Sequence, residues 1–324
     1  MSLAIWCNGK FSDEATRQLV EGTQAHRLIW AQKLSQNVLQ AGEPDATTAE
    51  ADVLFGQPAI SDCLESKRVR WVEINSAGYT RFDTPEFREA MLARGALVSN
   101  ASEVFADPCA QHVLAMMLAL GRNLLPSHRD QLTDHSWHYQ ERRYHSALLT
   151  GQTVLMLGYG AIGRRLTELL APFGMKLYAV RRQTRSETGV TIIAEDRLSS
   201  VLAEADHVVN ILPDNAATRG YVNARRLSCC RRGAKFYNVG RGNTVDEPAL
   251  IAALESGRLG AAYLDVFDPE PLAPGHPLWT TPHCYVTPHT AGGRRDQDEA
   301  LVGHFLSNLA RFAQGSKSLV DRVI

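Results

Sequence analysis

Short apolar runs alternate with helical patterns of apolar and polar positions along most of the chain. Parallel strands joined by covering helices produce this alternation, because each parallel connection needs a crossover. In the first hundred residues, helices are predicted at Ser12–Glu21 and Pro85–Arg94. The predicted strands there are Leu3–Cys7, Leu28–Trp30, Val53–Phe55, Arg70–Ile74 and Ala96–Val98. This part of the chain therefore predicts a small α/β domain.

A second alternation begins at Thr153 and fills most of the remaining chain. Its predicted strands are Val154–Leu157, Lys176–Val180, His207–Leu212, Ala234–Val239, Ala261–Phe267 and Tyr285–Thr287. Strands separated in this way by helical patterns predict a doubly wound parallel sheet. With 324 residues the chain exceeds what one core usually holds, so we expect two domains.

The segments outside the two alternations predict connecting elements. Asp107 is a good N-cap and Pro108 suits the first helical position, so a long helix is predicted over Pro108–Leu125. The polar segment Ser127–His145 is predicted to be an extended loop. A last helix, Asp296–Phe312, is expected to cross back onto the first domain.

Charge and composition argue against several classes of protein. Lys plus Arg number 34 and Asp plus Glu 35, and a net charge of −1 is unlike that of a general nucleic-acid binder. No uninterrupted apolar run approaches about 18 residues, the closest being Val113–Leu120, so no membrane helix is expected. The 6 cysteines are scattered, which is unlike a disulfide framework. With no signal-peptide pattern at the N-terminus, we expect a cytoplasmic protein.

The strongest local motif is a glycine-rich turn between a strand and a helix. The strand Val154–Leu157 runs into Gly158-Tyr159-Gly160-Ala161-Ile162-Gly163, and a helix is predicted to follow through Leu170. In such a turn the first glycine allows the tight bend, the second lets a pyrophosphate approach the backbone, and the third permits close helix packing. The helix N-terminus also attracts phosphates. Because the motif opens a strand–helix–strand unit, it favours dinucleotide binding over a glycine turn with no ligand.

Two arginines stand where the next strand ends, about 20 residues after the glycines. A carboxylate at that position would bind the ribose 2′-hydroxyl of NAD, but here Val180 is followed by Arg181 and Arg182. Guanidinium groups bind a 2′-phosphate through charge-assisted hydrogen bonds, so these residues favour NADP(H) over NAD(H). The alternative is that both arginines are simply solvated at a strand end.

Four motifs in family-like order make the sequence resemble the D-isomer-specific 2-hydroxyacid dehydrogenases over most of the chain. They are GYGAIGRRL at Gly158, NVGRGNTVDEPALIAAL at Asn238, GAAYLDVFDPEP at Gly260 and TPHTAG at Thr287. The resemblance implies a Rossmann doubly wound parallel sheet at residues 100–290, plus a flavodoxin-like α/β substrate domain from residues 1–99 and 291–324. It also implies an active site in the cleft between these domains, and a homodimer formed through Pro108–Leu125 and the Trp137 loop.

In that family an Arg, a Glu and a His carry the reaction, and they fall here on Arg241, Glu270 and His289. Arg241 follows a predicted strand, and its planar donors can hold a carboxylate and polarise the neighbouring keto oxygen. His289, as imidazolium, can protonate the C2 oxygen while hydride arrives at C2. Glu270 is expected to pair with His289 and to raise the pKa of the imidazole. Alone, each would be an ordinary surface, turn or core residue; together they predict a catalytic site.

Further positions carry over from the resemblance with alternatives open. Asp265 resembles the residue that hydrogen-bonds the nicotinamide carboxamide, although it could be purely structural. Thr218 resembles a cofactor-lining residue but could be a turn hydroxyl, and the Ser76 loop resembles one whose backbone amides hold the substrate carboxylate but could be a glycine turn. The expected cofactor-binding residues are Gly158, Gly160, Ala161, Ile162, Gly163, Arg181, Arg182, Leu212, Pro213, Thr218, Val239, Gly240 and Asp265. The expected substrate-binding residues are Ser76, Ala77, Gly78 and Arg241.

The reaction expected from the resemblance is NADPH-dependent reduction of a small 2-oxoacid to the D-2-hydroxyacid. The stretch His276-Pro277-Leu278-Trp279 looks like glyoxylate/hydroxypyruvate reductases, and Glu270 counts against a formate dehydrogenase, whose pattern has Gln there. Two alternatives stay open: a dinucleotide-sensing binding protein without significant turnover, and NAD-linked oxidation of a 2-hydroxyacid such as phosphoglycerate. No metal is expected, because the four histidines between residues 128 and 145 lack zinc-type spacing.

Overall fold

The chain forms two compact units in the computed structural model, which describes residues 2–38, 40–181 and 186–324. Unit 1 comprises Met1–Phe105 and Arg294–Ile324, and unit 2 comprises Ala106–Gly293. The sequence placed these boundaries at residues 99/100 and 290/291. The first boundary lies later in the structure because Val104 and Phe105 pack with Leu301 in a cluster of unit 1.

The described part of unit 1 is built on a five-stranded parallel sheet with the order β2-β1-β3-β4-β5. The strands are β1 (Ala4–Gly9), β2 (Arg27–Ser35), β3 (Val53–Gly56), β4 (Trp71–Ile74) and β5 (Leu97–Ser99). The helices are α1 (Asp13–Gly22), α2 (Ile60–Glu65), α3 (Pro85–Arg94) and α11 (Gln297–Ala313). This strand order is the flavodoxin-like one, so the predicted fold class of this unit is confirmed.

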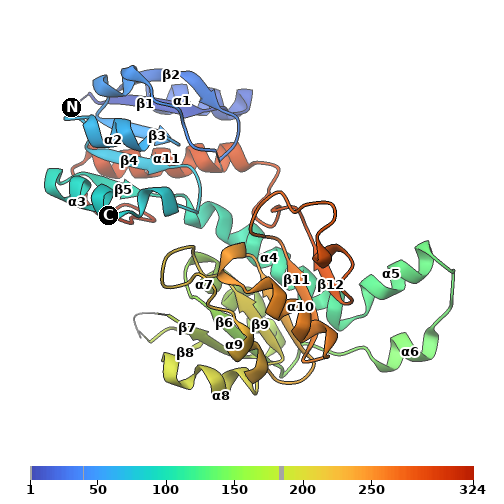
Figure 1. Cartoon of the computed structure of the whole chain (residues 1–324). Helices are drawn as coiled ribbons and strands as arrows, with labels where there is room; N and C mark the ends of the chain where they lie inside the picture. The colour runs from blue at the N-terminus through green and yellow to red at the C-terminus, as the bar shows by residue number, and fades with distance from the viewer. Residues whose placement is uncertain (1, 39, 182–185) are drawn as a thin grey trace. The chain divides into compact units, whose positions relative to one another are not determined.

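Different helices cover the two faces of the unit 1 sheet (Figure 1). On one face α1 and α11 pack on the strands, and the rings of Phe55 and Phe305 stack with their centroids 4.1 Å apart. On the other face α2 and α3 contribute Cys63 and Phe87 to a second cluster. β1, β3, β4 and β5 are buried along their whole length and are mostly apolar in sequence, whereas the edge strand β2 is largely exposed and carries several polar residues.

The described part of unit 2 contains a seven-stranded parallel sheet with the order β12-β11-β10-β9-β6-β7-β8. Its strands are β6 (Thr153–Leu157), β7 (Lys176–Val180), β8 (Thr191–Ile193), β9 (His207–Asn210), β10 (Ala234–Asn238), β11 (Leu259–Leu264) and β12 (Cys284–Val286). The chain winds outward from β6 to one side and then from β9 to the other, so the strand order reverses between β6 and β9. This is the predicted Rossmann arrangement, which places ligands at the carboxyl ends of the strands beside the reversal.

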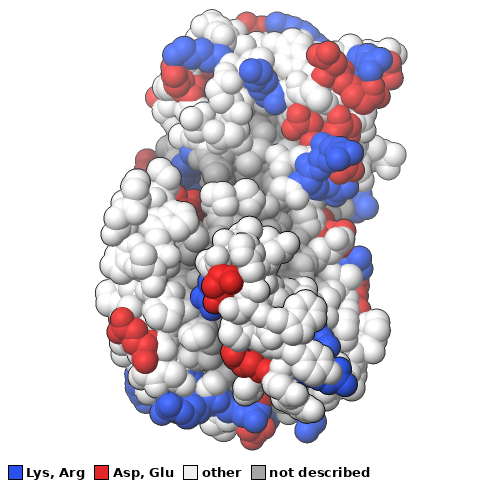
Figure 2. Space-filling view, turned by 90° about the vertical axis from the view of Figure 1, so that its right-hand side faces the viewer, with Lys and Arg blue, Asp and Glu red and all other residues white. Residues whose placement is uncertain are grey.

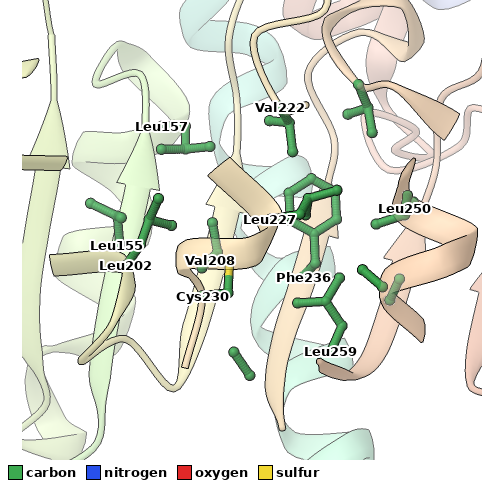
Figure 3. Packing of buried hydrophobic residues seen from close by; sticks show 14 of the residues in the cluster. Leu155, Leu157, Leu202, Val208, Val222, Leu227, Cys230, Phe236, Leu250 and Leu259 are labelled. Carbon is green, nitrogen blue, oxygen red and sulfur yellow. The ribbon is translucent and has the colours of Figure 1, made fainter. Parts of the chain in front are cut away.

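One face of the unit 2 sheet is covered by α8 (Leu198–Leu202), α9 (Ala224–Cys229) and α10 (Glu247–Glu255). Figure 3 shows Leu227 of α9 packed beside Phe236 of β10 in the middle of this core. The other face is covered by α4 (Ser102–Gly121) and α7 (Ala161–Leu170). Val113 of α4 and Leu166 of α7 are fully buried there.

Helix α4 begins at Ser102 and contains Pro108 in its interior, so the predicted start at Pro108 was wrong. The Ser102 N–H donates to Asn100 Oδ1 at 3.3 Å, and the Glu103 N–H donates to Asp321 Oδ2 at 2.7 Å. These caps, one of them from the far end of the chain, satisfy the first helical amides. Among the described helices, α4 alone has the length and apolar composition to cross a membrane, and 44% of that stretch is buried within the protein.

The segment predicted as an extended loop instead contains two helices, α5 (Leu124–Leu132) and α6 (Tyr139–Tyr144). Arg142 donates to Asp130 Oδ2 from Nε at 2.9 Å and from Nη2 at 2.6 Å, which joins the two helices. They form an arm that extends away from the rest of unit 2 (Figure 1). The sequence also missed the edge strand β8 (Thr191–Ile193), of which only Ile193 is buried.

Candidate active site

Six segments that the sequence marked as functional lie at one edge of the unit 2 sheet. The described strands of this sheet are all parallel, so their carboxyl ends share that edge. The segments are the glycine turn after β6, Arg181 after β7, residues 212–213 after β9, 239–241 after β10, 265–270 after β11 and 287–289 after β12. The topology thus gathers residues that are far apart along the chain.

The turn between β6 and α7 has the geometry of a phosphate cradle. Gly158 has a φ of +95°, in the left-handed region that favours glycine, and its N–H donates to the Val180 carbonyl at 3.0 Å. Gly160 is the N-cap of α7, no side chain caps it, and no described atom lies within 4 Å of the position that a Cβ would take. The first turn of the helix is formed by Ala161, Ile162 and Gly163. An uncapped helix N-terminus with open space beside it fits the phosphates of a dinucleotide.

Arg181 follows β7 directly and lies beside the glycine turn, because Val180 is bonded to Gly158. Its Nη1 donates to Glu187 Oε1 at 2.7 Å, and the two side chains are 22% and 28% exposed. Sequence reasoning missed this carboxylate, because Glu187 lies beyond the spacing at which a ribose-binding acid is expected. Arg182, the second predicted arginine, lies outside the described residues.

Arg241 follows β10 and is partly buried. Its Nη1 donates to the Gly240 carbonyl at 2.6 Å. Burial lowers the pKa of the guanidinium, while the nearby carboxylates of Glu270 and Asp214 act in the opposite direction. Burial also raises the pKa of the Cys109 thiol to about 12, so this thiol is neutral at physiological pH. A guanidinium stays charged in such surroundings and can bind a carboxylate with two parallel hydrogen bonds.

Glu270 and His289 form a direct pair. Glu270 Oε2 lies 2.7 Å from His289 Nδ1, and Glu270 Oε1 accepts from the Phe267 N–H at 2.9 Å. Burial acts to raise the pKa of Glu270, but the hydrogen bonds from His289 and Phe267 and the charge of Arg241 outweigh it and hold that pKa below its ordinary value. Because Nδ1 is directed at Glu270, Nε2 is the ring nitrogen left to face a substrate.

Both carboxylate oxygens of the buried Asp265 bind the segment that carries His289. Oδ1 accepts from the Thr290 N–H at 2.8 Å and from the Thr287 hydroxyl, and Oδ2 accepts from the Ala291 N–H at 2.9 Å. The Asp265 carbonyl accepts from the His289 N–H at 2.9 Å. His289 has a φ of +54°, which a residue with a side chain rarely adopts. These bonds therefore hold His289 in an unfavourable backbone conformation.

The remaining predicted cofactor residues lie in the loops after β9 and β10. Val239 is buried, and a Cβ on Gly240 would lie 2.7 Å from the Leu212 carbonyl oxygen, so the two loops leave no room for a side chain. The Thr218 hydroxyl donates to the Pro213 carbonyl at 2.6 Å and accepts from the Asn215 N–H at 3.0 Å. This hydroxyl closes its own turn, which is the alternative that the sequence left open.

Three buried polar residues that the sequence analysis did not select hold the Arg241 turn. Asn238 Oδ1 accepts from the Gly240 N–H at 3.1 Å and from Asn210 Nδ2 at 3.0 Å. Thr244 Oγ1 donates to the Arg241 carbonyl at 2.6 Å and accepts from Asn210 Nδ2 at 2.7 Å. A polar residue at the end of an otherwise apolar strand is the available signal, and Asn210 and Asn238 both fit it.

The predicted substrate loop lies in unit 1, after β4. Gln57 Nε2 donates to Ser76 Oγ at 3.0 Å, and Ser76 Oγ donates to the Gly78 carbonyl at 2.8 Å. Asn100 Nδ2 donates to the Ala77 carbonyl at 2.7 Å. These side chains brace the loop, and its contact with substrate stays a prediction.

Among the described residues, Asp130, Asp134 and His138 of the arm have donor atoms close enough to hold a metal ion. Asp130 is already paired with Arg142 at 2.6 Å, so this group by itself identifies no metal centre. On the face shown in Figure 2, Lys and Arg groups lie beside Asp and Glu groups, with uncharged areas between them. The expectations of no metal and no nucleic acid stay predictions.

Comparison with known proteins decides the family. Residues 114–291 match the model of the "D-isomer specific 2-hydroxyacid dehydrogenase, NAD binding domain". The chain belongs to the D-isomer specific 2-hydroxyacid dehydrogenases. The glyoxylate reductase of Aeropyrum pernix is 31% identical to this dehydrogenase in an alignment 294 residues long, which covers 85% of this chain and 84% of the relative.

Two further relatives extend the comparison. The D-3-phosphoglycerate dehydrogenase of Mycobacterium tuberculosis is 29% identical in an alignment 316 residues long, which covers 96% of this chain and 55% of that protein. The D-isomer specific 2-hydroxyacid dehydrogenase of Xanthobacter autotrophicus Py2, solved in complex with NADPH and MES, is 27% identical, with a TM-score of 0.83 and coverage of 100% of this chain and 98% of that one. The predicted family and enzyme class are therefore confirmed: this dehydrogenase is an NAD(P)-dependent oxidoreductase.

Proposed function

We propose that this dehydrogenase reduces a small 2-oxoacid of the glyoxylate or hydroxypyruvate type to the D-2-hydroxyacid, using NADPH in preference to NADH. The observation that carries the proposal is the 2.7 Å pair of Glu270 and His289, at the sheet edge that also holds Arg241 and the glycine turn. The A. pernix glyoxylate reductase supports the substrate class, and the NADPH complex of the X. autotrophicus protein supports the cofactor.

Each member of the triad has one role in this proposal. Arg241 binds the substrate carboxylate and polarises the C2 carbonyl. His289 donates the proton on Nε2 to the C2 oxygen, and Glu270, held against Nδ1, orients the ring and favours its charged form. The reduced nicotinamide, when bound, supplies the hydride that C2 accepts. One proton and one hydride together convert the keto group into the secondary alcohol.

At the cofactor end, the N-terminus of α7 and the turn at Gly158 would hold the pyrophosphate, and Arg181 and Arg182 would bind the 2′-phosphate. Replacing both arginines with Ala should lower the NADPH-to-NADH ratio of kcat/KM. An unchanged ratio would contradict the proposed preference.

The reaction is tested by a screen of 2-oxoacids with NADPH and with NADH. The rate is measured as the loss of absorbance of the reduced nicotinamide. Steady turnover of glyoxylate or hydroxypyruvate with NADPH is expected, and Arg241→Ala should abolish most of it. Tight NADPH binding with no turnover of any 2-oxoacid would favour a dinucleotide sensor instead. Oxidation of phosphoglycerate with NAD that is faster than reduction of any 2-oxoacid with NADPH would favour the activity named for the M. tuberculosis relative.

We also propose that the dehydrogenase is a cytoplasmic homodimer that pairs through the arm of α5 and α6. The arm and its flanks expose large apolar side chains that a second copy would cover: Leu124 56%, Leu132 69%, Trp137 91%, Tyr144 74% and Leu148 65%. Sedimentation equilibrium should give twice the 35.7 kDa chain mass. Trp137→Ser with Tyr144→Ser should weaken the dimer; a monomeric parent protein would contradict this part of the proposal.

A further inference from the structure

We infer that Glu187 sets how strongly the cofactor site prefers a 2′-phosphate over a free 2′-hydroxyl. The inference rests on the proposed function, because it concerns the end of the dinucleotide that Arg181 is proposed to bind. It assigns a role in cofactor discrimination to a residue outside the family motifs.

The position of Glu187 follows from the way the chain returns to the sheet. Glu187 forms an isolated antiparallel bridge with Val190, and β8 begins immediately afterwards and pairs with β7. This return brings the Glu187 carboxylate to the carboxyl end of β7, where its Oε1 accepts a hydrogen bond from Arg181 Nη1 at 2.7 Å. Glu187 therefore places a carboxylate at the end of β7, although no acidic residue stands there at the expected spacing in the sequence.

The pair also lies where the ribose is expected in a Rossmann unit. Arg181 follows Val180, whose carbonyl accepts the Gly158 N–H at 3.0 Å, so the pair stands next to the glycine turn. The two side chains are 22% and 28% exposed, so they are shielded from water on part of their surface but open to a ligand. Shielding of this kind strengthens charge interactions relative to a fully solvated pair.

The Arg181–Glu187 pair should interact differently with the 2′-phosphate of NADPH and the 2′-hydroxyl of NADH. The dianionic 2′-phosphate of NADPH must share Arg181 with Glu187 and is repelled by its charge. The 2′-hydroxyl of NADH carries no charge and can donate a hydrogen bond to the carboxylate. Glu187 therefore opposes the preference that Arg181 creates, and the site keeps the ability to use both cofactors.

The test uses fragments that contain only the adenosine end of each cofactor. Isothermal titration of the full chain with 2′,5′-ADP and with 5′-AMP gives the ratio of the two affinities without catalysis. Glu187→Gln should tighten 2′,5′-ADP about fivefold and leave 5′-AMP unchanged or weaker, and the gain should shrink at high salt. Glu187→Ala, which removes the acceptor altogether, should move the ratio in the same direction.

Two controls isolate the effect. Glu168→Gln removes the same charge from another Arg–Glu pair, that of Arg165 and Glu168 on α7, and should leave the ratio unchanged. In an Arg181→Ala background, Glu187→Gln should no longer tighten 2′,5′-ADP by that amount, because the two residues act as one pair.

The outcomes separate this inference from the proposed function. If Arg181→Ala weakens 2′,5′-ADP while both Glu187 variants leave the ratio where it was, the inference is overturned and the proposed NADPH preference stands. If Arg181→Ala also leaves the ratio unchanged, Arg181 does not bind the 2′-phosphate and the inference is overturned. The NADPH preference itself is contradicted only if replacement of both Arg181 and Arg182 leaves it unchanged. If Glu168→Gln and Glu187→Gln increase the affinity for 2′,5′-ADP equally, the cause is the change in net charge of the protein and not the position of Glu187. That result would overturn the inference as well.

Discussion

Glu270 holds His289 by one carboxylate oxygen while its other oxygen is held by the Phe267 backbone. The carboxylate is thus fixed from both sides, and the imidazole has one defined neighbour at Nδ1. The hydrogen bonds and the charge of Arg241 also keep the pKa of Glu270 below its ordinary value, so the acid stays ionised across the neutral range. An ionised Glu270 can accept a hydrogen bond from Nδ1 of the imidazole, which leaves Nε2 to face a substrate.

Replacing Glu270 with Gln should lower kcat/KM for reduction by about 10²-fold, the lower end of what a positioned acid–base group contributes. The amide cannot stabilise the imidazolium, so the pH above which reduction fails should move downward. A pH profile of kcat/KM measures this shift. The matched control is Glu247→Gln, which alters another Glu–His pair, with His276 at 3.2 Å, and should leave the limit in place. Equal profiles for Glu270→Gln and the parent would remove Glu270 from the proton step.

Replacing Asp265 with Asn should lower kcat and leave NADPH affinity close to that of the parent. The amide NH2 must face either the Thr290 or the Ala291 N–H, and a donor facing a donor costs about 1–3 kcal/mol. The left-handed backbone of His289 then loses part of its support. Kinetics and NADPH titration by fluorescence give the two quantities separately. Weaker NADPH binding with normal kcat would instead support the carboxamide contact predicted from the sequence.

Gly240→Ala and Gly160→Ala should separate stability from cofactor binding. At Gly240 the new methyl group meets the Leu212 carbonyl oxygen at 2.7 Å, so the free energy of unfolding should fall by about 1–3 kcal/mol. At Gly160 the described structure leaves the space open, so the change in stability should stay below about 1 kcal/mol while NADPH binding weakens. Urea titration and NADPH titration of both variants provide the measurements. Equal destabilisation of the two variants would contradict the close approach of the loops after β9 and β10.

Acid should destabilise the protein through His207. Burial, with repulsion from Lys235, lowers the pKa of His207 to about 3 from an unfolded value of 6.5. The unfolded chain therefore binds a proton that the folded chain excludes, and stability falls progressively as the pH drops from 6.5 toward 3. Between pH 7 and pH 5 the loss from this group is about 2 kcal/mol.

Urea titrations at pH 7, 6 and 5 test the His207 prediction. His207→Gln should be less stable at pH 7, because Tyr237 and Gln152 lose their ring partner, but its stability should depend less on pH. His283→Asn, which alters an exposed histidine with left-handed backbone, should keep the slope of the parent. Parallel slopes for parent and His207→Gln would assign the acid sensitivity to other groups.

The strands, the glycine turn and the order of motifs could be predicted because each depends on local pattern. β7 (Lys176–Val180) and α3 (Pro85–Arg94) have the predicted bounds, since apolar runs and a Pro-started helix define both ends. The pairing of Glu270 with His289 was also predicted, but only because both lie in motifs of a known family.

The features that escaped prediction depend on contacts between distant residues. Asp321 accepts the Glu103 N–H at the start of α4, Arg142 pairs with Asp130 in the arm, and no local pattern encodes either contact. Asp265 was assigned by analogy, and its bonds to the His289 segment are visible only in three dimensions.

The candidate active site lies at the carboxyl ends of the unit 2 strands, and a second rim of the same sheet lies at their amino ends. The described polar residues of this second rim bond to one another and hold the strands together. Asp206 accepts the Thr153 N–H at 2.9 Å and pairs with Arg231, and His207 bonds Gln152 and Tyr237. Strand β6 has five residues, so about 16 Å separate this rim from the candidate active site. At that distance the effects of two substitutions on the free energy of unfolding usually add. Substitutions that raise stability at the amino-end rim and substitutions that alter substrate preference at the carboxyl-end rim should therefore have additive effects. The two sets can be selected separately and then combined in one protein.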